Sequence, residues 1–259
     1  MSTLDVIPLP FARDNYLWLI GNGRHAALVD PGEAAPALAA LERNRLEPAA
    51  ILLTHHHADH TGGVAEIVAH YPKGAIPVHG PRKEDIAGVD HPVDDGDRVS
   101  IPALGLDLQV LGVAAHTRGH VAYFGHGMLF CGDTLFSAGC GRIFEGTPAD
   151  LARALARLSR LDAATKVYCA HEYTLANLAF ARAAEPANAE RDRYATRCEA
   201  LRAQGRPTLP STIATERAIN PFLRTDEAHV IAAVAARAGT RPANALACLA
   251  ALRAWKDTF

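Results

Sequence analysis

The sequence has few of the residues that would mark a disulfide-bonded or membrane-spanning protein. Its five cysteines are scattered and include no CxxC pair, so we expect neither a disulfide framework nor a zinc ribbon. No apolar run reaches the roughly 18 residues that a membrane-spanning helix needs, and the first residues do not have the pattern of a secretory signal peptide. We therefore expect a cytoplasmic protein with reduced, buried thiols.

An excess of charge of either sign is also lacking. Lys and Arg number 26 against 28 Asp and Glu, so no overall positive field would attract nucleic acid or an anionic membrane, and we expect neither as a partner. Trp and Met occur only twice each, whereas there are thirteen histidines. Histidine is the commonest ligand of transition metals, so the positions of these histidines are the most informative feature of the composition.

The pattern of apolar runs divides the chain into two parts. Up to about residue 173, short apolar runs alternate with turn residues, which predicts strands over 4–9, 16–20, 26–29, 50–54, 76–78, 106–113, 121–124, 128–131 and 166–169. Two helices are predicted among them, over 64–70 and 149–160, the second beginning at Thr147-Pro148. Beyond residue 174 the strand pattern stops, and helices are predicted over 175–184, 187–204, 227–238 and 243–256. We predict an α/β domain over 1–173 and a smaller all-helical domain over 174–259.

One segment, THHHADHTGG at 54–63, carries the strongest chemical signal. It follows a buried apolar strand, and in the extended stretch after that strand side chains alternate, so His55 and His57 point to one side. Asp59 and His60 then fall on the first turn of a helix and can reach a second point nearby. Imidazole together with carboxylate oxygen suits zinc, manganese or iron.

Three further candidate ligands follow other predicted strands. His116 comes after strand 106–113, Asp133 after strand 128–131 and His171 after strand 166–169. Loops at strand ends are where a rigid scaffold carries chemistry, so together with the first segment they predict a site for two divalent metal ions. Closed structural zinc sites use four Cys or His ligands, so Asp59 and Asp133 favour a catalytic centre over a structural zinc module.

The order HxHxDH, lone His, GDT, lone His resembles the metallo-β-lactamase superfamily. Within it, GCGR at 139–142, HEYT at 171–174, NPFLR at 220–224 and RAWKD at 253–257 resemble the glyoxalase II, or hydroxyacylglutathione hydrolase, family. The resemblance spans nearly the whole chain. It implies an αββα sandwich with a helical C-terminal domain that binds glutathione, and two metal ions, zinc in the first instance with iron or manganese as alternatives.

The resemblance also implies a role for each matching residue. It places His55, His57 and His116 on one metal and Asp59, His60 and His171 on the other, with Asp133 bridging the two. Asp59 would in addition help to orient the hydroxide. Contacts to the anionic glutathione moiety are implied for Arg142, Tyr173, Arg253 and Lys256, the last two lying three apart on one helix face.

The remaining histidines are expected to be packing or surface residues, with His120 supporting the ligands rather than binding metal. They are His25, His56, His70, His79, His91, His120, His126 and His229. Cys131, two residues before Asp133, is expected to be a buried thiol.

A metal centre alone does not identify the leaving group, because related scaffolds cleave thioesters, lactams, lactones and phosphodiesters. The glyoxalase II resemblance implies hydrolysis of the thioester S-D-lactoylglutathione to glutathione and D-lactate by a metal-bridging hydroxide, the second step of methylglyoxal detoxification. A persulfide dioxygenase, or another hydrolase of the same fold, is the alternative. We expect a monomer whose partner is this small-molecule substrate.

Overall fold

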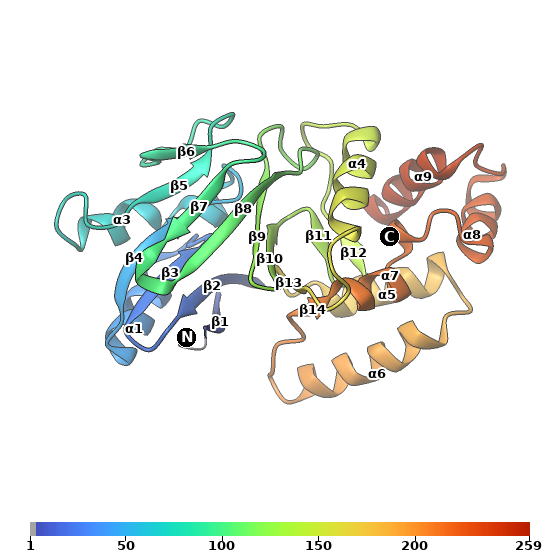
Figure 1. Ribbon diagram of the computed structural model, residues 1–259. Helices are drawn as coiled ribbons and strands as arrows, with labels where there is room; N and C mark the ends of the chain where they lie inside the picture. The colour runs from blue at the N-terminus through green and yellow to red at the C-terminus, as the bar shows by residue number, and fades with distance from the viewer. Residues whose placement is uncertain (1–3) are drawn as a thin grey trace. The chain divides into compact units, whose positions relative to one another are not determined.

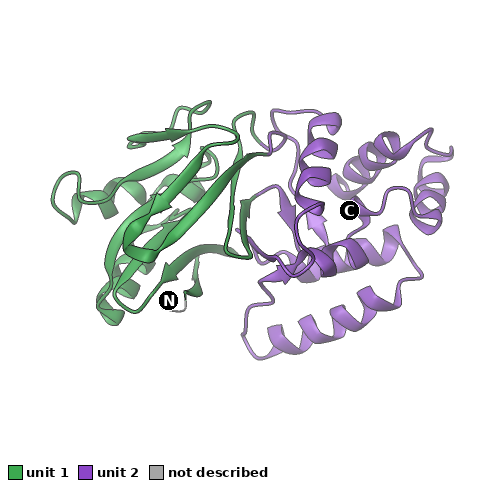
Figure 2. Cartoon of the chain, viewed as in Figure 1, with its two compact units in different colours: residues 1–112, 117–132 green, residues 113–116, 133–259 purple. Residues whose placement is uncertain are grey.

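The computed structural model describes residues 4–259, which form two compact units (Figure 1, Figure 2). Unit 1 comprises the chain up to Gly112 together with Thr117–Gly132, and unit 2 comprises Val113–His116 and Asp133–Phe259. Of the N-terminal segment considered for a signal peptide, residues 1–3 lie outside the described part. None of the described helices is long and apolar enough to cross a membrane.

Unit 1 contains a six-stranded sheet. Its first three strands pair antiparallel, and from the third strand to the sixth all neighbours pair parallel. Its strands, in spatial order, are β1 (Asp5–Phe11), β2 (Asn15–Gly21), β3 (His25–Val29), β4 (Glu47–Leu52), β5 (Val78–Pro81) and β6 (His91–Val93). Alternate residues such as Leu17, Leu19 and Leu28 pack on α1 (Ala34–Asn44) and α3 (Val64–Ala69) in one core. The short helix α2 (Ala58–Thr61) precedes α3.

Unit 1 also contains four consecutive strands of a second sheet, which pair as an antiparallel meander. It contains β7 (Arg98–Ile101), β8 (Leu106–Gly112), β9 (Val121–Gly125) and β10 (Met128–Gly132), with the 3-10 turn η1 (Pro102–Leu104) after β7. The buried Tyr123 of β9 donates its hydroxyl to the carbonyl of Leu53, just beyond β4, at 2.9 Å. Because Leu53 directly precedes the Thr54–Gly63 segment, this bond fixes the start of that segment against the second sheet.

Unit 2 is mostly helical. It contains α4 (Pro148–Ser159), α5 (Thr174–Ala184), α6 (Ala189–Ala203), α7 (Ile213–Ile219), η2 (Pro221–Leu223), α8 (Ala228–Ala238) and α9 (Ala245–Asp257). It also holds the hairpin of β11 (Leu135–Phe136) and β12 (Gly139–Cys140), and the antiparallel pair of β13 (Lys166–Cys169) and β14 (Ser211–Thr212). Thr147 caps α4 in a reciprocal capping box with Asp150, which confirms the predicted start of that helix.

The predicted α/β class is confirmed, and all nine predicted strands are present with ends displaced by up to three residues. The expectation of only two helices before residue 173 is wrong, because α1 is a third. Its N-cap residue, Glu33, makes no side-chain hydrogen bond to the helix AAPALAALERN, so the usual Ser, Thr, Asp or Asn start signal is missing. The expectation that strands end by residue 174 is also wrong, because β14 pairs with β13. A strand of two residues has no periodicity to detect.

The compact units do not divide where the predicted domains do. Residues 133–173 and the helices that follow lie together in unit 2. The predicted helical domain over 174–259 remains a proposal.

Buried polar side chains hold the β11–β12 hairpin from several helices of unit 2. Ala138, at its turn, has a left-handed φ of 56°, and its N–H donates to Glu216 at 2.8 Å. The amide of Asn220 donates to the carbonyls of Phe136 and Gly139, and that of Asn177 donates to the carbonyl of Ser137. Because each partner is buried, these bonds satisfy backbone groups that water cannot reach.

Burial raises the pKa of Glu216 to about 7, which makes the stability of the fold depend on pH. Since the carboxyl holds its proton more tightly when folded than when unfolded, its contribution is fully present below about pH 4.5 and is lost as the pH rises through 7. Between pH 5 and pH 8 we expect the unfolding free energy of the wild type to fall by about 3 kcal/mol relative to that of Glu216→Gln, because the glutamine keeps the shape of the side chain and cannot ionise.

Urea unfolding at the two pH values measures this difference. Glu199→Gln, on the exposed face of α6, is the matched control, and its unfolding free energy should change with pH as that of the wild type does. If the unfolding free energies of Glu216→Gln and the wild type change equally between the two pH values, the buried carboxyl does not titrate in this range.

Candidate metal centre

His55 and His57 converge as their alternation in the sequence predicts. Nε2 of His55 lies 3.0 Å from Nδ1 of His57, close to the spacing of about 3.3 Å expected for two nitrogens on one tetrahedral zinc ion. His55 is fully buried and its Nδ1 lies 3.1 Å from the hydroxyl of Thr54. The pair therefore presents two imidazole nitrogens to one point.

Asp59 and His60 lie side by side on α2, with 3.6 Å between Nε2 of His60 and a carboxylate oxygen of Asp59. Nδ1 of the buried His60 donates to Asp30 at 3.0 Å, so its Nε2 carries a lone pair. Asp30 is itself buried and also accepts hydrogen bonds from the backbone N–H and the hydroxyl of Thr54. The same oxygen of Asp59 accepts a hydrogen bond from the amide of Asn15 at 2.9 Å.

Unit 2 supplies a carboxylate placed between two imidazoles. The Nε2 atoms of His116 and His171 lie 3.5 Å and 3.4 Å from different oxygens of Asp133. Nδ1 of His116 donates to the carbonyl of Arg142 at 2.9 Å, which directs its Nε2 toward Asp133. One carboxylate oxygen near each imidazole is compatible with a carboxylate that bridges two metal ions.

These side chains fit divalent metal ions. Metal-binding histidines in proteins typically donate the second ring N–H to a carboxylate or carbonyl, as His60 and His116 do here. In the described part of the chain, the groups of His, Cys, Asp and Glu able to hold a metal ion are drawn only from His55, His57, Asp59, His60, His116, Asp133 and His171. They are the seven predicted ligands, and this set of His and Asp side chains is compatible with a binuclear centre.

Two carboxylates of unit 1 that the sequence analysis missed bind histidines of the Thr54–Gly63 segment. Asp30 orients His60, and Glu84 accepts from Nδ1 of His56 at 3.0 Å and from the N–H of Gly119 at 2.9 Å. The hydroxyl of Thr117 also donates to Glu84, so this residue fixes the loop that leads into β9. Asp30 could have been noticed because, like Asp133, it directly follows an apolar strand. Glu84 gives no such signal.

His120 and the cysteines lie where they were expected. The ring of His120 is buried and stacks on that of His55, with centroids 4.6 Å apart and planes 16° from parallel. This contact limits the orientation of His55, which is a supporting role. All five cysteines, Cys131 included, are buried and free.

Three of the four predicted substrate residues reach the surface of unit 2. Tyr173 stacks on His171 with centroids 4.6 Å apart, and the Arg142 side chain is exposed beside Asp257. The ammonium of Lys256 lies over the ring of Phe180, and burial, reinforced by the nearby Arg253 charge, lowers its pKa.

Arg253 is different, because it is only 5% exposed. It donates to the carbonyl of Cys140 at 2.8 Å and to Asp257 at 3.1 Å. A direct contact between Arg253 and a substrate remains a prediction.

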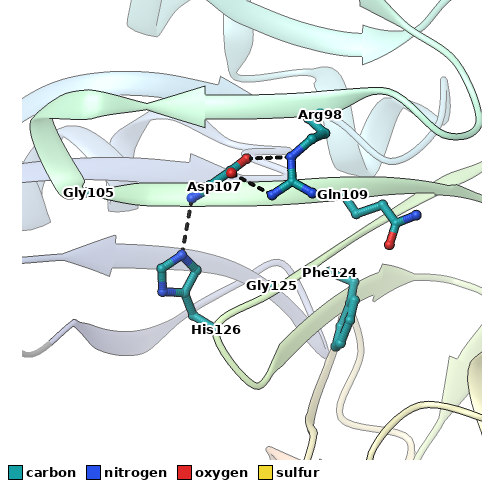
Figure 3. A pocket seen from close by; sticks show the side chains of 7 residues that line it. All are labelled: Arg98, Gly105, Asp107, Gln109, Phe124, Gly125 and His126. Carbon is teal, nitrogen blue, oxygen red and sulfur yellow. Dashed lines mark hydrogen bonds and ion pairs between the residues drawn. The ribbon is translucent and has the colours of Figure 1, made fainter.

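An open hollow in unit 1, of about 480 Å³, contains none of the candidate ligands (Figure 3). Figure 3 shows that its polar groups bind one another: Arg98 pairs with Asp107, and the backbone N–H of Asp107 donates to His126. His126 therefore has a local structural role, as expected for a histidine outside the motif.

Two family models match the chain, and the first defines its class. A model described as the metallo-β-lactamase superfamily matches residues 12–171, and the crystal structure of TTHA1623 in a di-iron-bound form superimposes with a TM-score of 0.60 at 25% identity, covering 84% of this chain and all of that one. The chain belongs to the metallo-β-lactamase superfamily and has its fold, as the resemblance implied.

The second model, described as the hydroxyacylglutathione hydrolase C-terminus, matches residues 172–259. Hydroxyacylglutathione hydrolases of Nitrosomonas eutropha and Cupriavidus taiwanensis are 46% and 50% identical to this chain, each comparison covering 99% of both proteins. Within the superfamily, the chain belongs to the hydroxyacylglutathione hydrolase family.

The bond between Asp30 and His60 generates a test of the metal centre. Asp30→Asn replaces one carboxylate oxygen by a donor, so the Thr54 and His60 donors can no longer all be accepted. We expect the affinity for one of the two metal ions to fall about 10- to 100-fold. Competition with a chromophoric chelator measures it.

Asp90→Asn is a matched control, because Asp90 also accepts from a backbone N–H and pairs with a histidine, His91, that is not a candidate ligand. Equal losses in both variants would mean that the Asp30 effect is not specific to the metal centre.

Proposed function

We propose that this protein hydrolyses S-D-lactoylglutathione and related 2-hydroxyacyl thioesters of glutathione, releasing glutathione and D-lactate as the second step of methylglyoxal detoxification. One observation carries the proposal: the complete set of seven His and Asp ligands occurs in one chain with the C-terminal region that defines hydroxyacylglutathione hydrolases. The reduced, buried cysteines support a cytosolic location. We propose that the enzyme acts as a monomer.

The proposal includes two divalent ions, zinc in the first instance, with iron or manganese as alternatives. His55, His57 and His116 would hold one ion, Asp59, His60 and His171 the other, and Asp133 both. Such ions, when bound, lower the pKa of coordinated water toward neutrality and polarise a carbonyl group. Buried hydrogen bonds at Nδ1 of His60 and His116 support this assignment, because they leave Nε2 of each ring able to bind a metal.

Residues of the chain would then orient the reacting groups. The Asp59 side chain is about half exposed and one of its oxygens is already held by Asn15, so it is suited to accept a hydrogen bond from the attacking nucleophile at a fixed position. The leaving group is a thiolate, which departs without strong help from a general acid. Cationic side chains would stabilise the negative charge of this thiolate and bind the two carboxylates of glutathione.

Arg142 and Lys256 are the cations best placed to provide this charge, since both side chains reach the surface of unit 2. The Arg142 guanidinium is oriented by Asp257, and the Lys256 ammonium lies over the ring of Phe180. Tyr173, fixed by stacking on His171, would add a hydroxyl donor. We propose that these three groups contact the glutathione moiety.

The direct test is hydrolysis of S-D-lactoylglutathione by the purified, metal-loaded protein, followed by the loss of thioester absorbance. We expect turnover that disappears on removal of the metal with a chelator and returns when zinc is restored. Oxygen consumption with glutathione persulfide, without thioester hydrolysis, would instead identify the protein as a dioxygenase.

Two substitutions should separate metal binding from substrate binding. His57→Ala removes a ligand, so we expect kcat to fall at least 100-fold. Lys256→Met keeps an unbranched side chain but removes a charge proposed to bind a remote part of the substrate, so we expect KM to rise about tenfold with kcat nearly unchanged. Steady-state kinetics of both variants measure the split. Similar losses of kcat in both would contradict the roles proposed here.

A further inference from the structure

The HEYT motif at 171–174 contains a glutamate, Glu172, that belongs neither to the candidate ligands nor to the proposed substrate contacts. Its side chain is only 6% exposed. One carboxylate oxygen accepts the backbone N–H of Thr208 at 2.9 Å, and the other accepts the Thr208 hydroxyl at 2.6 Å. Because both oxygens are bound by one residue, the position and the direction of the carboxylate are fixed.

Thr208 also lies against the other end of the motif. Its hydroxyl oxygen is 2.6 Å from that of Thr174, the first residue of α5, and both threonines are buried. Three residues after Thr208 the chain forms β14, which pairs with β13, the strand that leads to His171. The guanidinium of Arg202 on α6, 3.8 Å from Glu172, adds an opposite charge. The motif is therefore tied to the segment between α6 and β14 at Glu172 and at Thr174.

The residues on either side of Glu172 carry the functional groups of the motif. Nε2 of His171 lies 3.4 Å from a carboxylate oxygen of Asp133, and the ring of Tyr173 stacks on that of His171, 5° from parallel. The ring of Phe136 meets both rings at steep angles, with centroid distances of 5.9 Å and 5.3 Å. Because successive Cα atoms are only about 3.8 Å apart, a shift of the backbone at Glu172 would move both rings.

We infer that Glu172 is a positioning residue, which fixes the His171 ring toward the metal centre and the Tyr173 hydroxyl toward the glutathione moiety through its hydrogen bonds with Thr208. The inference rests on the proposed function for the roles of His171 and Tyr173. It predicts that loss of this one buried carboxylate weakens metal binding and substrate binding together. By contrast, His57→Ala and Lys256→Met should affect turnover and substrate binding separately.

The test compares the zinc affinity, by competition with a chelator, and the steady-state kinetics of Glu172→Met and Glu172→Gln. Glu172→Met keeps an unbranched side chain but leaves the N–H of Thr208 without its acceptor. We expect the affinity for one of the two zinc ions to fall about 10- to 100-fold and KM to rise about fivefold. Glu172→Gln should recover most of both losses, because its amide oxygen can accept the N–H and its amide nitrogen can donate to the Thr208 hydroxyl.

Asp150→Leu is the matched control, because Asp150 in the first turn of α4 also accepts the N–H and the hydroxyl of one threonine, Thr147, at 2.8 Å and 2.6 Å. This variant should lower the free energy of unfolding in urea but bind zinc like the wild type. Wild-type zinc affinity in Glu172→Met, or an equal loss of zinc affinity in Asp150→Leu, would overturn the inference and leave Glu172 with a role in stability alone.

If Glu172→Met fails to fold, as shown by circular dichroism, Thr208→Val decides, because it removes the hydroxyl bound to Glu172 and keeps the N–H. Weaker zinc binding by Thr208→Val supports the inference, and wild-type binding refutes it. The zinc measurements need no substrate. A wild type that binds zinc but hydrolyses no thioester would refute the proposed function, while the zinc affinities would still test the link between Glu172 and His171.

Discussion

The candidate metal centre depends on one constraint, the placement of a proton on Nδ1 of its buried histidines. An imidazole can offer Nε2 to a metal only while Nδ1 carries the proton, and a buried N–H needs an acceptor. Asp30 accepts from His60, and the carbonyl of Arg142 accepts from His116. These two acceptors set the directions in which the Nε2 lone pairs of His60 and His116 point.

Each acceptor has a supporting structure of its own. Asp30 would be a costly buried charge if it stood alone, but the N–H and hydroxyl of Thr54 satisfy it within unit 1. The Arg142 carbonyl belongs to a segment held by Arg253 and continuous with the hairpin that Glu216 and Asn220 hold. Helices of the C-terminal region therefore contribute buried polar groups to the part of unit 2 that carries His116 and Asp133.

Four of the candidate ligands could be predicted from one stretch of the sequence because their signal is local, whereas the acceptors of buried donors could not. His55, His57, Asp59 and His60 lie within six residues, and alternation after a strand is enough to group them. Asp30 lies 30 residues from His60, and Glu216 lies 78 residues from the N–H it accepts. No pattern within a short stretch of sequence relates two residues that lie so far apart in the chain. Helix α1 was missed for a different reason, since tertiary packing of its alanine and leucine face replaces the missing cap.

Arg253 and Lys256 show how far helical periodicity can be taken. A spacing of three residues places them on one face of α9, and from that face a shared role was expected. Periodicity predicts the direction in which a side chain points but not how deeply the side chain is buried. Arg253 meets Phe222 and the Cys140 carbonyl and is buried, whereas Lys256, one turn nearer the C-terminus, extends over Phe180 and keeps solvent access. Two cations three residues apart on one helix can thus differ widely in their access to solvent.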